Sequence, residues 1–133
     1  MRYRYIAYKY TRRARQDTTF QNMWESFGSW PMMAAIVWRP PTDVYETPDE
    51  IMVVIELAGV AEDAMTVSLF SDLLVVEGRR EQPVLADMNA CQQLGIKYGD
   101  FRSEIQLSGP VEKDNVTAEY KNGLLKIILK KLN

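Results

Sequence analysis

Histidine is absent from this chain, and cysteine occurs once, as Cys91. Without histidine, a protein lacks the commonest general base, the commonest metal ligand and the usual proton switch near neutral pH. A single cysteine forms no internal disulfide and brings no second thiol for a zinc site, which favours a reducing compartment. We therefore expect no catalytic residue, no metal and no cofactor, and we expect a cytoplasmic location.

Long apolar runs are missing as well. No run reaches the roughly 18 residues that a membrane helix requires, and the Arg-rich start has no uninterrupted apolar segment of the kind found in signal peptides. The chain also lacks a glycine-rich phosphate loop. The carboxylate pairs Asp49-Glu50 and Glu62-Asp63 fall at predicted turns, where solvation explains them. These absences argue against a membrane partner and against an enzyme.

Charge divides the chain in two. Residues 1–38 carry six basic residues against two acidic ones, a net charge of +4, whereas the remaining residues carry ten against sixteen, a net charge of −6. A chain of 133 residues is long enough for one domain with an extension. We predict an N-terminal arm over residues 1–38 and a folded domain over residues 39–133.

The arm holds nine of the fourteen aromatic residues and is expected to be partly helical or disordered. Its apolar residues between positions 20 and 27 recur at i, i+3, i+4 and i+7, the spacing of one helical face, and Gly28 and Pro31 would end such a helix. An amphipathic helix more often packs onto its own domain, but an aromatic surface of this size outside a folded domain usually binds a partner. The candidate binding residues are Phe20, Met23, Trp24, Phe27, Trp30, Met32 and Met33.

The domain is predicted to be all-β. Seven short segments of strand length are separated by turn residues, and Asn122-Gly123 is a strong signal for a type I′ hairpin turn. Such a series of short strands indicates an antiparallel β-sandwich. The predicted strands are residues 42–47, 50–57, 65–70, 73–79, 100–107, 116–121 and 124–129.

Residues 80–97 interrupt this series. They separate two predicted strands by more than the dozen or so residues of an ordinary connection, and connections of this length are usually functional or mobile. Within the connection, residues 91–96 could form a short strand of their own.

Five short segments occur in a fixed order along residues 38–130, and together they resemble the α-crystallin domain of the small heat-shock proteins, in the bacterial and plant-like branch. Each segment is a weak signal alone, whereas the ordered set is specific. The segments are WRPPTDVYETPDE (38–50), ELAGV (56–60), LLVVEGRR (73–80), YGDF (98–101) and AEYKNGLLKI (118–127).

The resemblance implies an immunoglobulin-like β-sandwich and an ATP-independent holdase chaperone, which captures unfolding proteins and assembles from homodimers, with higher oligomers built from them. It also implies that residues 80–97 exchange a strand with the partner's sheet edge, which covers that edge with backbone hydrogen bonds. The alternative is a flexible loop that folds back on its own domain. The dimer-interface residues implied are Asp43, Tyr45, Cys91, Leu94, Ile96, Tyr98, Phe101 and Arg102.

By the same resemblance, the arm captures unfolding proteins, because methionine and aromatic side chains adapt to many partners. An apolar docking groove is also implied at the edge of the sandwich between residues 65–70 and 116–121. Its residues would be Val67, Leu69, Val116 and Ala118, although periodicity alone favours a place in the core for them.

The sequence departs from the family pattern at three places, of which two bear on assembly; the third is Leu107-Ser108 and Lys130-Lys131 at the ends of two strands, where the family usually has proline. Ser103 stands where the family usually has arginine, with Arg102 one place earlier on the opposite face. The family's C-terminal I-x-I/V tail motif, which docks into a neighbour's groove, has no counterpart up to Asn133. From this we expect an open groove and dimers or smaller arm-driven assemblies.

Two other functions compete with this interpretation. The alternating Arg and Tyr residues at positions 2–5, with Tyr8, Lys9 and Tyr10, could stack on single-stranded RNA, but the acidic domain carries no recognised RNA-binding module, so nucleic acid is not expected as a partner. The second alternative is an adaptor or co-chaperone that uses the same β-sandwich to bind one folded partner.

Overall fold

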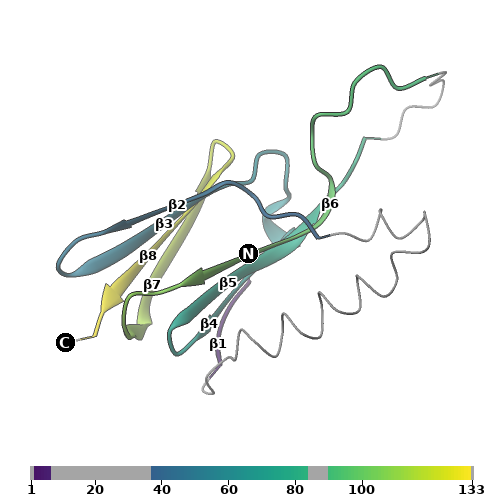
Figure 1. Ribbon diagram of the computed structural model, residues 1–133. Helices are drawn as coiled ribbons and strands as arrows, with labels where there is room; N and C mark the ends of the chain where they lie inside the picture. Colours follow the sequence, from purple (N-terminus) through teal and green to yellow (C-terminus); the bar gives the residue numbers. More distant parts are fainter. Residues whose placement is uncertain (1, 7–36, 84–89, 133) are drawn as a thin grey trace, which may run out of the picture.

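A computed structural model describes residues 2–6, 37–83 and 90–132, and these form two four-stranded sheets that pack face to face (Figure 1). Sheet A has the strand order β1-β4-β5-β6, and sheet B has the order β2-β3-β8-β7. The all-β sandwich predicted from the sequence is therefore confirmed. The strands are β1 (Arg2–Ile6), β2 (Thr42–Glu46), β3 (Glu50–Glu56), β4 (Met65–Phe70), β5 (Leu73–Arg80), β6 (Gly99–Gln106), β7 (Val111–Lys121) and β8 (Leu124–Lys131).

The core lies between the two sheets and follows the alternation of the sequence. In β3, Ile51, Val53 and Ile55 are buried in it, whereas Met52 and Val54 on the outer face are half-buried. The outer face of β3 is therefore only partly covered. The other strands supply the core residues Met65, Val67, Leu69, Leu74, Val76, Phe101, Ile105, Leu125, Ile127 and Leu129.

The β7–β8 hairpin turns at the predicted place. Asn122 has a φ of 54° and Gly123 a φ of 80°, and these two positive values are those of a type I′ turn. A side chain at position 123 would also meet the Ala58 backbone, with 3.2 Å to its Cα. The hairpin consequently brings β7 and β8 beside the turn that follows β3.

β1 is absent from the sequence prediction. It pairs in parallel with β4, from Arg2 opposite Thr66 to Ile6 opposite Phe70, and all other strand pairs are antiparallel. Two further differences from the sequence prediction concern β7 and the connection before β6. β7 begins at Val111, five residues earlier than predicted, with an irregular register up to Val116, and residues 90–98 form no strand.

Trp38, assigned to the arm on composition, lies in the core beyond β6. Its N–H donates to the Asp100 carbonyl at 3.1 Å, and its carbonyl accepts from the Arg102 N–H at 3.0 Å. Its ring packs against Phe101 with 5.6 Å between centroids. The chain thus enters the described domain at the β6 edge of sheet A. The boundary between arm and domain stays a prediction.

Within the described ranges, the chain has no helix that combines the length and the apolar character needed to cross a membrane.

Candidate functional site

The free edge of sheet B is the first candidate binding surface. β2 ends this sheet and pairs only with β3 among the described strands. Its two large apolar side chains, Val44 and Tyr45, are about half exposed. The Tyr45 hydroxyl donates to the Asp43 carboxylate at 3.2 Å, and this hydrogen bond to a negative group raises the pKa of Tyr45. A strand edge of this kind is a template for pairing with another chain.

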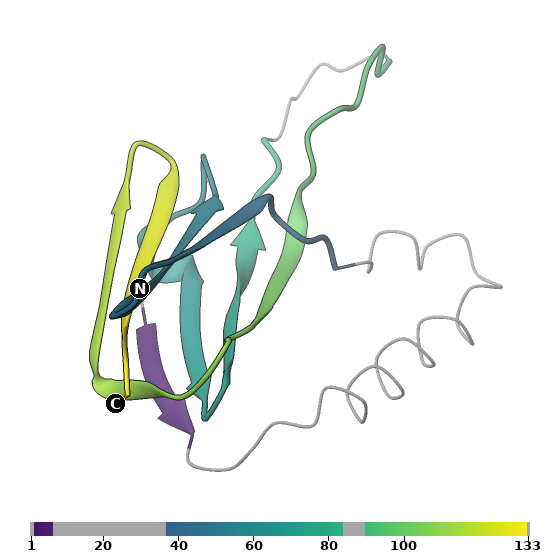
Figure 2. The ribbon, with the colours of Figure 1, turned by 60° about the vertical axis from the view of Figure 1, so that its left-hand side comes forward.

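The connection between β5 and β6 is the second surface. Its described parts, residues 81–83 and 90–98, stand clear of the two sheets in both views of the ribbon (Figure 2). Leu94 is 76% exposed and Ile96 is 65% exposed. Large apolar side chains that remain this exposed on a folded domain indicate a surface that a partner covers.

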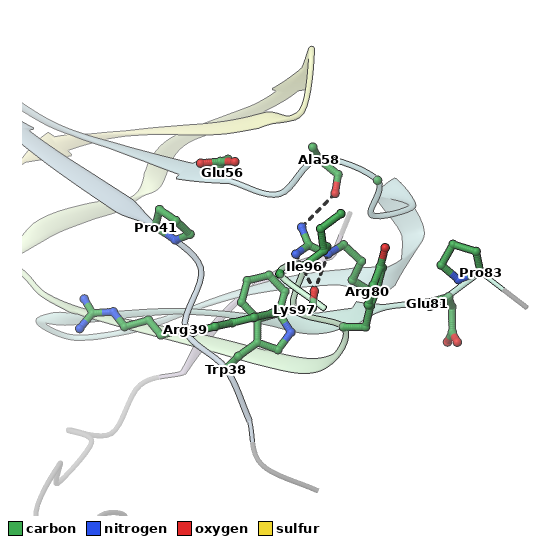
Figure 3. A pocket seen from close by; sticks show the side chains of 13 residues that line it. Trp38, Arg39, Pro41, Glu56, Ala58, Arg80, Glu81, Pro83, Ile96 and Lys97 are labelled. Atoms are coloured by element: carbon green, nitrogen blue, oxygen red, sulfur yellow. Dashed lines mark hydrogen bonds between the residues drawn. The ribbon is translucent and has the colours of Figure 1, made fainter. Parts of the chain in front are cut away.

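Arg80 fixes the base of this connection, as Figure 3 shows. Its Nε and Nη2 donate to the Lys97 carbonyl at 2.9 and 2.5 Å, and its Nη1 donates to the Ala58 carbonyl at 3.1 Å. Its guanidinium carbon lies 4.4 Å from the centre of the Trp38 ring and 5.6 Å from that of Tyr98. A planar guanidinium can make this fork and stack on rings at the same time, which lysine cannot do. Arg80 therefore attaches both ends of the connection, at residues 80 and 97, to the domain.

A hollow of about 650 Å³ opens beside Arg80, between the end of β3 and the connection. Trp38, Ile96 and Tyr98 give it an apolar wall, and Arg39 and Glu56 add opposite charges. This lining suits a protein side chain better than a metal. Among the described residues, His, Cys, Asp and Glu form no cluster that could hold a metal ion.

The predicted dimer-interface residues divide into two groups. Asp43, Tyr45, Cys91, Leu94 and Ile96 are exposed on β2 and the connection, and Tyr98 is half-buried at the connection's base. Two residues do not face an open surface. Phe101 is buried in the core, and Arg102 forms ion pairs within the chain, with Glu77 at 2.5 Å and Glu104 at 2.8 Å.

Ser103 takes the place of the family's usual arginine and is fully buried. Its hydroxyl lies 3.1 Å from that of Thr42, which is also 2.9 Å from the Pro40 carbonyl. Because the Thr42 hydroxyl has one hydrogen and uses it on that carbonyl, Ser103 is the donor to Thr42. A neutral hydrogen bond between β6 and β2 thus occupies the position where an arginine would bring a charge.

The four predicted groove residues also differ among themselves. Val67 and Leu69 are completely buried in the core, the position that periodicity favours, while Val116 is half-buried and Ala118 exposed. The edge beside β4 is not open as expected, because β1 of the same chain pairs with it. The Tyr3 hydroxyl also donates across the sandwich to the Lys113 carbonyl of β7, at 3.0 Å.

The predicted binding residues of the arm, Phe20, Met23, Trp24, Phe27, Trp30, Met32 and Met33, lie outside the described residues. Of the features that sequence reasoning missed, β1 and Arg80 matter most here. The alternation of tyrosine with arginine at the start of the chain is a strand signal in retrospect, whereas the contacts of Arg80 depend on segments far apart in the sequence.

Comparison with known proteins decides the family. The model of the Hsp20/alpha crystallin family matches residues 43–133. The chain belongs to this family. Small heat shock protein C4 of Rickettsia felis is 28% identical to this member of the Hsp20 family over 118 residues, which are 86% of this chain and 72% of the relative.

Solved structures agree with this assignment. The Del-C4 mutant of hsp14.1 from Sulfolobus solfatataricus P2 is 28% identical, and the alignment covers 86% of this chain and 98% of that one with a TM-score of 0.56. HspA from Xanthomonas axonopodis, 23% identical, shares the fold with a TM-score of 0.65 over 72% of this chain and 96% of its own. The resemblance drawn from five short segments is confirmed, and membership of the Hsp20 family supports a chaperone role.

Proposed function

We propose that the protein is an ATP-independent holdase that assembles from strand-exchanged dimers and captures unfolding proteins through its arm. The observation that carries the proposal is the exposure of Leu94 and Ile96 on a connection that is clear of the sheets, together with the free β2 edge. The domain fills its own core without these residues. The proposal places the protein in the cytoplasm and requires no catalysis.

In the proposed dimer, residues 91–96 of one chain pair with β2 of its partner. The strand would satisfy the backbone groups along the free edge of β2 and would bring Leu94 and Ile96 against exposed apolar side chains of β2, such as Val44. Arg80 supports this arrangement, because its bonds to Lys97 and Ala58 fix where the connection leaves the domain.

Capture by the arm rests on its composition. Each fully buried Leu, Phe or Met side chain contributes roughly 1.5–3 kcal/mol, so three or four contacts give about micromolar affinity after the costs of association. The acidic domain, with a net charge of −6 from ten basic and sixteen acidic residues, would keep the loaded complex soluble.

The test is light scattering of a heat-labile protein without ATP, with the full chain and a triple variant, Phe20→Ser, Trp24→Ser and Phe27→Ser. We expect the variant to lose most of its protection, because it lacks the large apolar side chains of one helical face. A matched control, Gln16→Ser, Gln21→Ser and Asn22→Ser, changes only polar residues of the arm and should protect like the parent. Equal protection by the triple variant and the parent would refute capture by the arm.

The same assay with several unrelated unfolding proteins separates a holdase from an adaptor. A holdase protects all of them at similar ratios, whereas an adaptor for one folded partner protects none. Retention of the protein on RNA in about 0.3 M salt would instead support the RNA alternative, and no retention would dismiss it.

A further inference from the structure

The turn between β7 and β8 brings together a side-chain amide and a backbone nitrogen that are able to react with each other. Its two central residues are Asn122, which is exposed, and Gly123, which is half-buried. The turn lies at one end of the sandwich (Figure 2). Asparagine followed by glycine is the pair in which the main-chain nitrogen reaches the side-chain carbon most easily, because glycine has no Cβ that obstructs the approach.

Neither of the two reacting groups is engaged in another bond. Among the residues that the structure describes, the Asn122 side-chain amide has no hydrogen-bond partner, and the Gly123 N–H donates to no acceptor. The amide carbon is therefore accessible to attack, and the attacking nitrogen gives up its proton without losing a hydrogen bond.

Asn115 in the same hairpin provides a contrast. Its Nδ2 donates to the Glu112 carboxylate at 2.5 Å, and the residue that follows it, Val116, is β-branched and belongs to β7. A branched side chain restricts the approach of the next backbone nitrogen. Asn115 is thus a matched control within the same molecule.

We propose that Asn122 is a site of spontaneous deamidation and isomerisation. The Gly123 nitrogen attacks the carbonyl carbon of the Asn122 side chain, and the new C–N bond closes a succinimide ring. The side-chain nitrogen leaves as ammonia and takes the proton of the Gly123 N–H. Water then opens the ring, its hydroxyl bonding to either ring carbonyl carbon and its remaining proton to the ring nitrogen. Attack at the side-chain carbon gives aspartate, and attack at the main-chain carbon gives isoaspartate.

The turn controls when this reaction occurs. A type I′ turn holds ψ of its first central residue near about 30°, and ring closure requires the peptide between Asn122 and Gly123 to rotate away from that value. The reaction consequently proceeds from the opened end of the hairpin. Heat favours local opening of this kind, so it should accelerate the modification.

The isoaspartate product would disturb the contact between the hairpin and the turn that follows β3. The Leu57 N–H donates to the Gly123 carbonyl at 2.8 Å, and a Cβ added at Gly123 would lie only 3.0 Å from the Ala58 Cβ. Isoaspartate inserts an additional carbon into the main chain before Gly123, so the turn and its bond to Leu57 cannot both be kept. Because the Ala58 carbonyl accepts from Arg80, the change would extend to the base of the connection.

Peptide mapping of the full chain tests the modification. The folded protein is incubated at neutral pH in water enriched in heavy oxygen and then digested in ordinary water, so that only rings opened during the incubation carry the label. Trypsin places Asn115 and Asn122 on separate peptides, because Lys121 lies between them. Labelled aspartate and isoaspartate should accumulate at Asn122 at least about tenfold faster than at Asn115. Equal rates at the two positions would overturn the proposal.

Hydrogen exchange tests the effect on the fold. In the isoaspartate fraction of the incubated parent, the Leu57 amide should exchange at least about tenfold faster than in fresh protein. The variant Asn122→Gly lacks the amide but accepts the same positive φ, so incubation should leave its Leu57 exchange unchanged. Unchanged exchange in the isoaspartate fraction would contradict the coupling to the turn after β3. The inference goes beyond the proposed function and does not rest on it, because both readouts need only the protein itself.

Discussion

Gly78 lies where β5 passes close to the Ala64 backbone and the Phe101 ring. A Cβ added at this position would lie 2.1 Å from the Ala64 carbonyl oxygen and 2.7 Å from the Phe101 ring. The first contact is with backbone and the second with a core side chain, so neither can move aside cheaply. The glycine in the LLVVEGRR segment (73–80) therefore has a packing reason.

The variant Gly78→Ala should therefore lower the free energy of unfolding by about 3 kcal/mol, the upper range for overpacking a core. Urea unfolding followed by circular dichroism measures the loss. Gly109→Ala is the control, because nothing lies within 4 Å of the added methyl group, and it should change the stability by less than about 0.5 kcal/mol. Equal stabilities of the two variants would contradict the packing argument.

Glu46 stabilises the fold near neutral pH, and we expect this contribution to be lost in acid. Its carboxylate accepts from the Lys131 ammonium at 2.8 Å and from the Ser108 hydroxyl, and these hydrogen bonds lower its pKa below the ordinary 4.5. A carboxyl group whose pKa is lowered by folding stabilises the native state above its unfolded pKa, and that stabilisation is lost as the pH falls through the folded value. The contribution is thus complete near neutral pH and fades below about pH 4.5.

The variant Glu46→Gln should consequently be less stable than the parent near neutral pH, and the difference should shrink as the pH falls from about 5 to about 3. Urea midpoints across this range measure it. Glu119→Gln, at an exposed position of β7, serves as the control for removing one surface carboxylate. A difference that stays constant with pH would show that the Lys131 bond does not carry the effect.

Local signals predicted single residues well. Asn122-Gly123 turns the hairpin and the alternate residues of β3 and β4 enter the core, because turn type and alternation depend on immediate neighbours. Contacts between distant segments have no such signal: Phe101, which the resemblance places at an interface, is buried in the core and packs against Trp38, which is 63 positions away in sequence. The bond between Ser103 and Thr42 likewise joins two sheets, and no local pattern encodes it.

At the scale of elements, the strands bounded by turn residues were found and the irregular ones were not. β4 has the predicted ends, whereas β7 starts early because an irregular register between Val111 and Val116 interrupts its pattern. β1 was missed because it is an isolated five-residue segment. No turn and no neighbouring strand in the sequence indicates which strand it pairs with. Parallel pairing with β4, some sixty residues later, is a tertiary contact.

If β1 protects the edge of β4, prolines in β1 should expose that edge. Replacing Arg4 and Tyr5 together by proline removes two successive N–H groups, so whichever of them donates to β4 is lost. Hydrogen exchange of the amides of β4 should speed up at least about tenfold at the residues that bond to β1, while β8 stays protected. Prolines at Thr11 and Arg12 are the control. Unchanged exchange in β4 would mean that β1 does not stay paired in solution.

At the scale of the whole molecule, the described residues include two surfaces with exposed apolar side chains that a second chain could cover, the β2 edge and the connection between β5 and β6. The β2 edge belongs to sheet B and the connection leaves from sheet A. Because Arg80 fixes the base of the connection, the connection cannot readily fold over the β2 edge of its own chain. Two chains can cover both surfaces of each other at once. Such a symmetric exchange is isologous and closes at the dimer.

If the proposed dimer forms by this exchange, the double variant Leu94→Asp with Ile96→Asp should weaken it at least about a hundredfold, because two side chains worth roughly 1.5–3 kcal/mol each are replaced by charges. Analytical ultracentrifugation over a dilution series measures the dissociation constant. Gln92→Asp with Gln93→Asp adds the same charge to the same exposed connection and should leave the dimer intact. A dimer equally stable in both variants would exclude exchange through this segment.

The family and the sandwich were predictable for the molecule as a whole, because the five motifs sit at the turns and close contacts that the fold requires. The contacts of Trp38 and of residues 2–6 were not. Composition predicts a boundary near Trp38, which stays a prediction, whereas Trp38 is buried in the core and residues 2–6 pair with β4. Charge and aromatic content describe what a segment could bind, and they do not reveal where its ends are attached.

The hydroxyl pair of Ser103 and Thr42 has a consequence for the response to the environment. Both buried polar side chains among the described residues, Ser68 and Ser103, are uncharged serines. Dissolved ions weaken attraction between charges and leave a bond between neutral hydroxyls almost untouched. A change in salinity should therefore act on the exposed ion pairs, such as Arg79 with Asp100, and leave this interior almost unchanged.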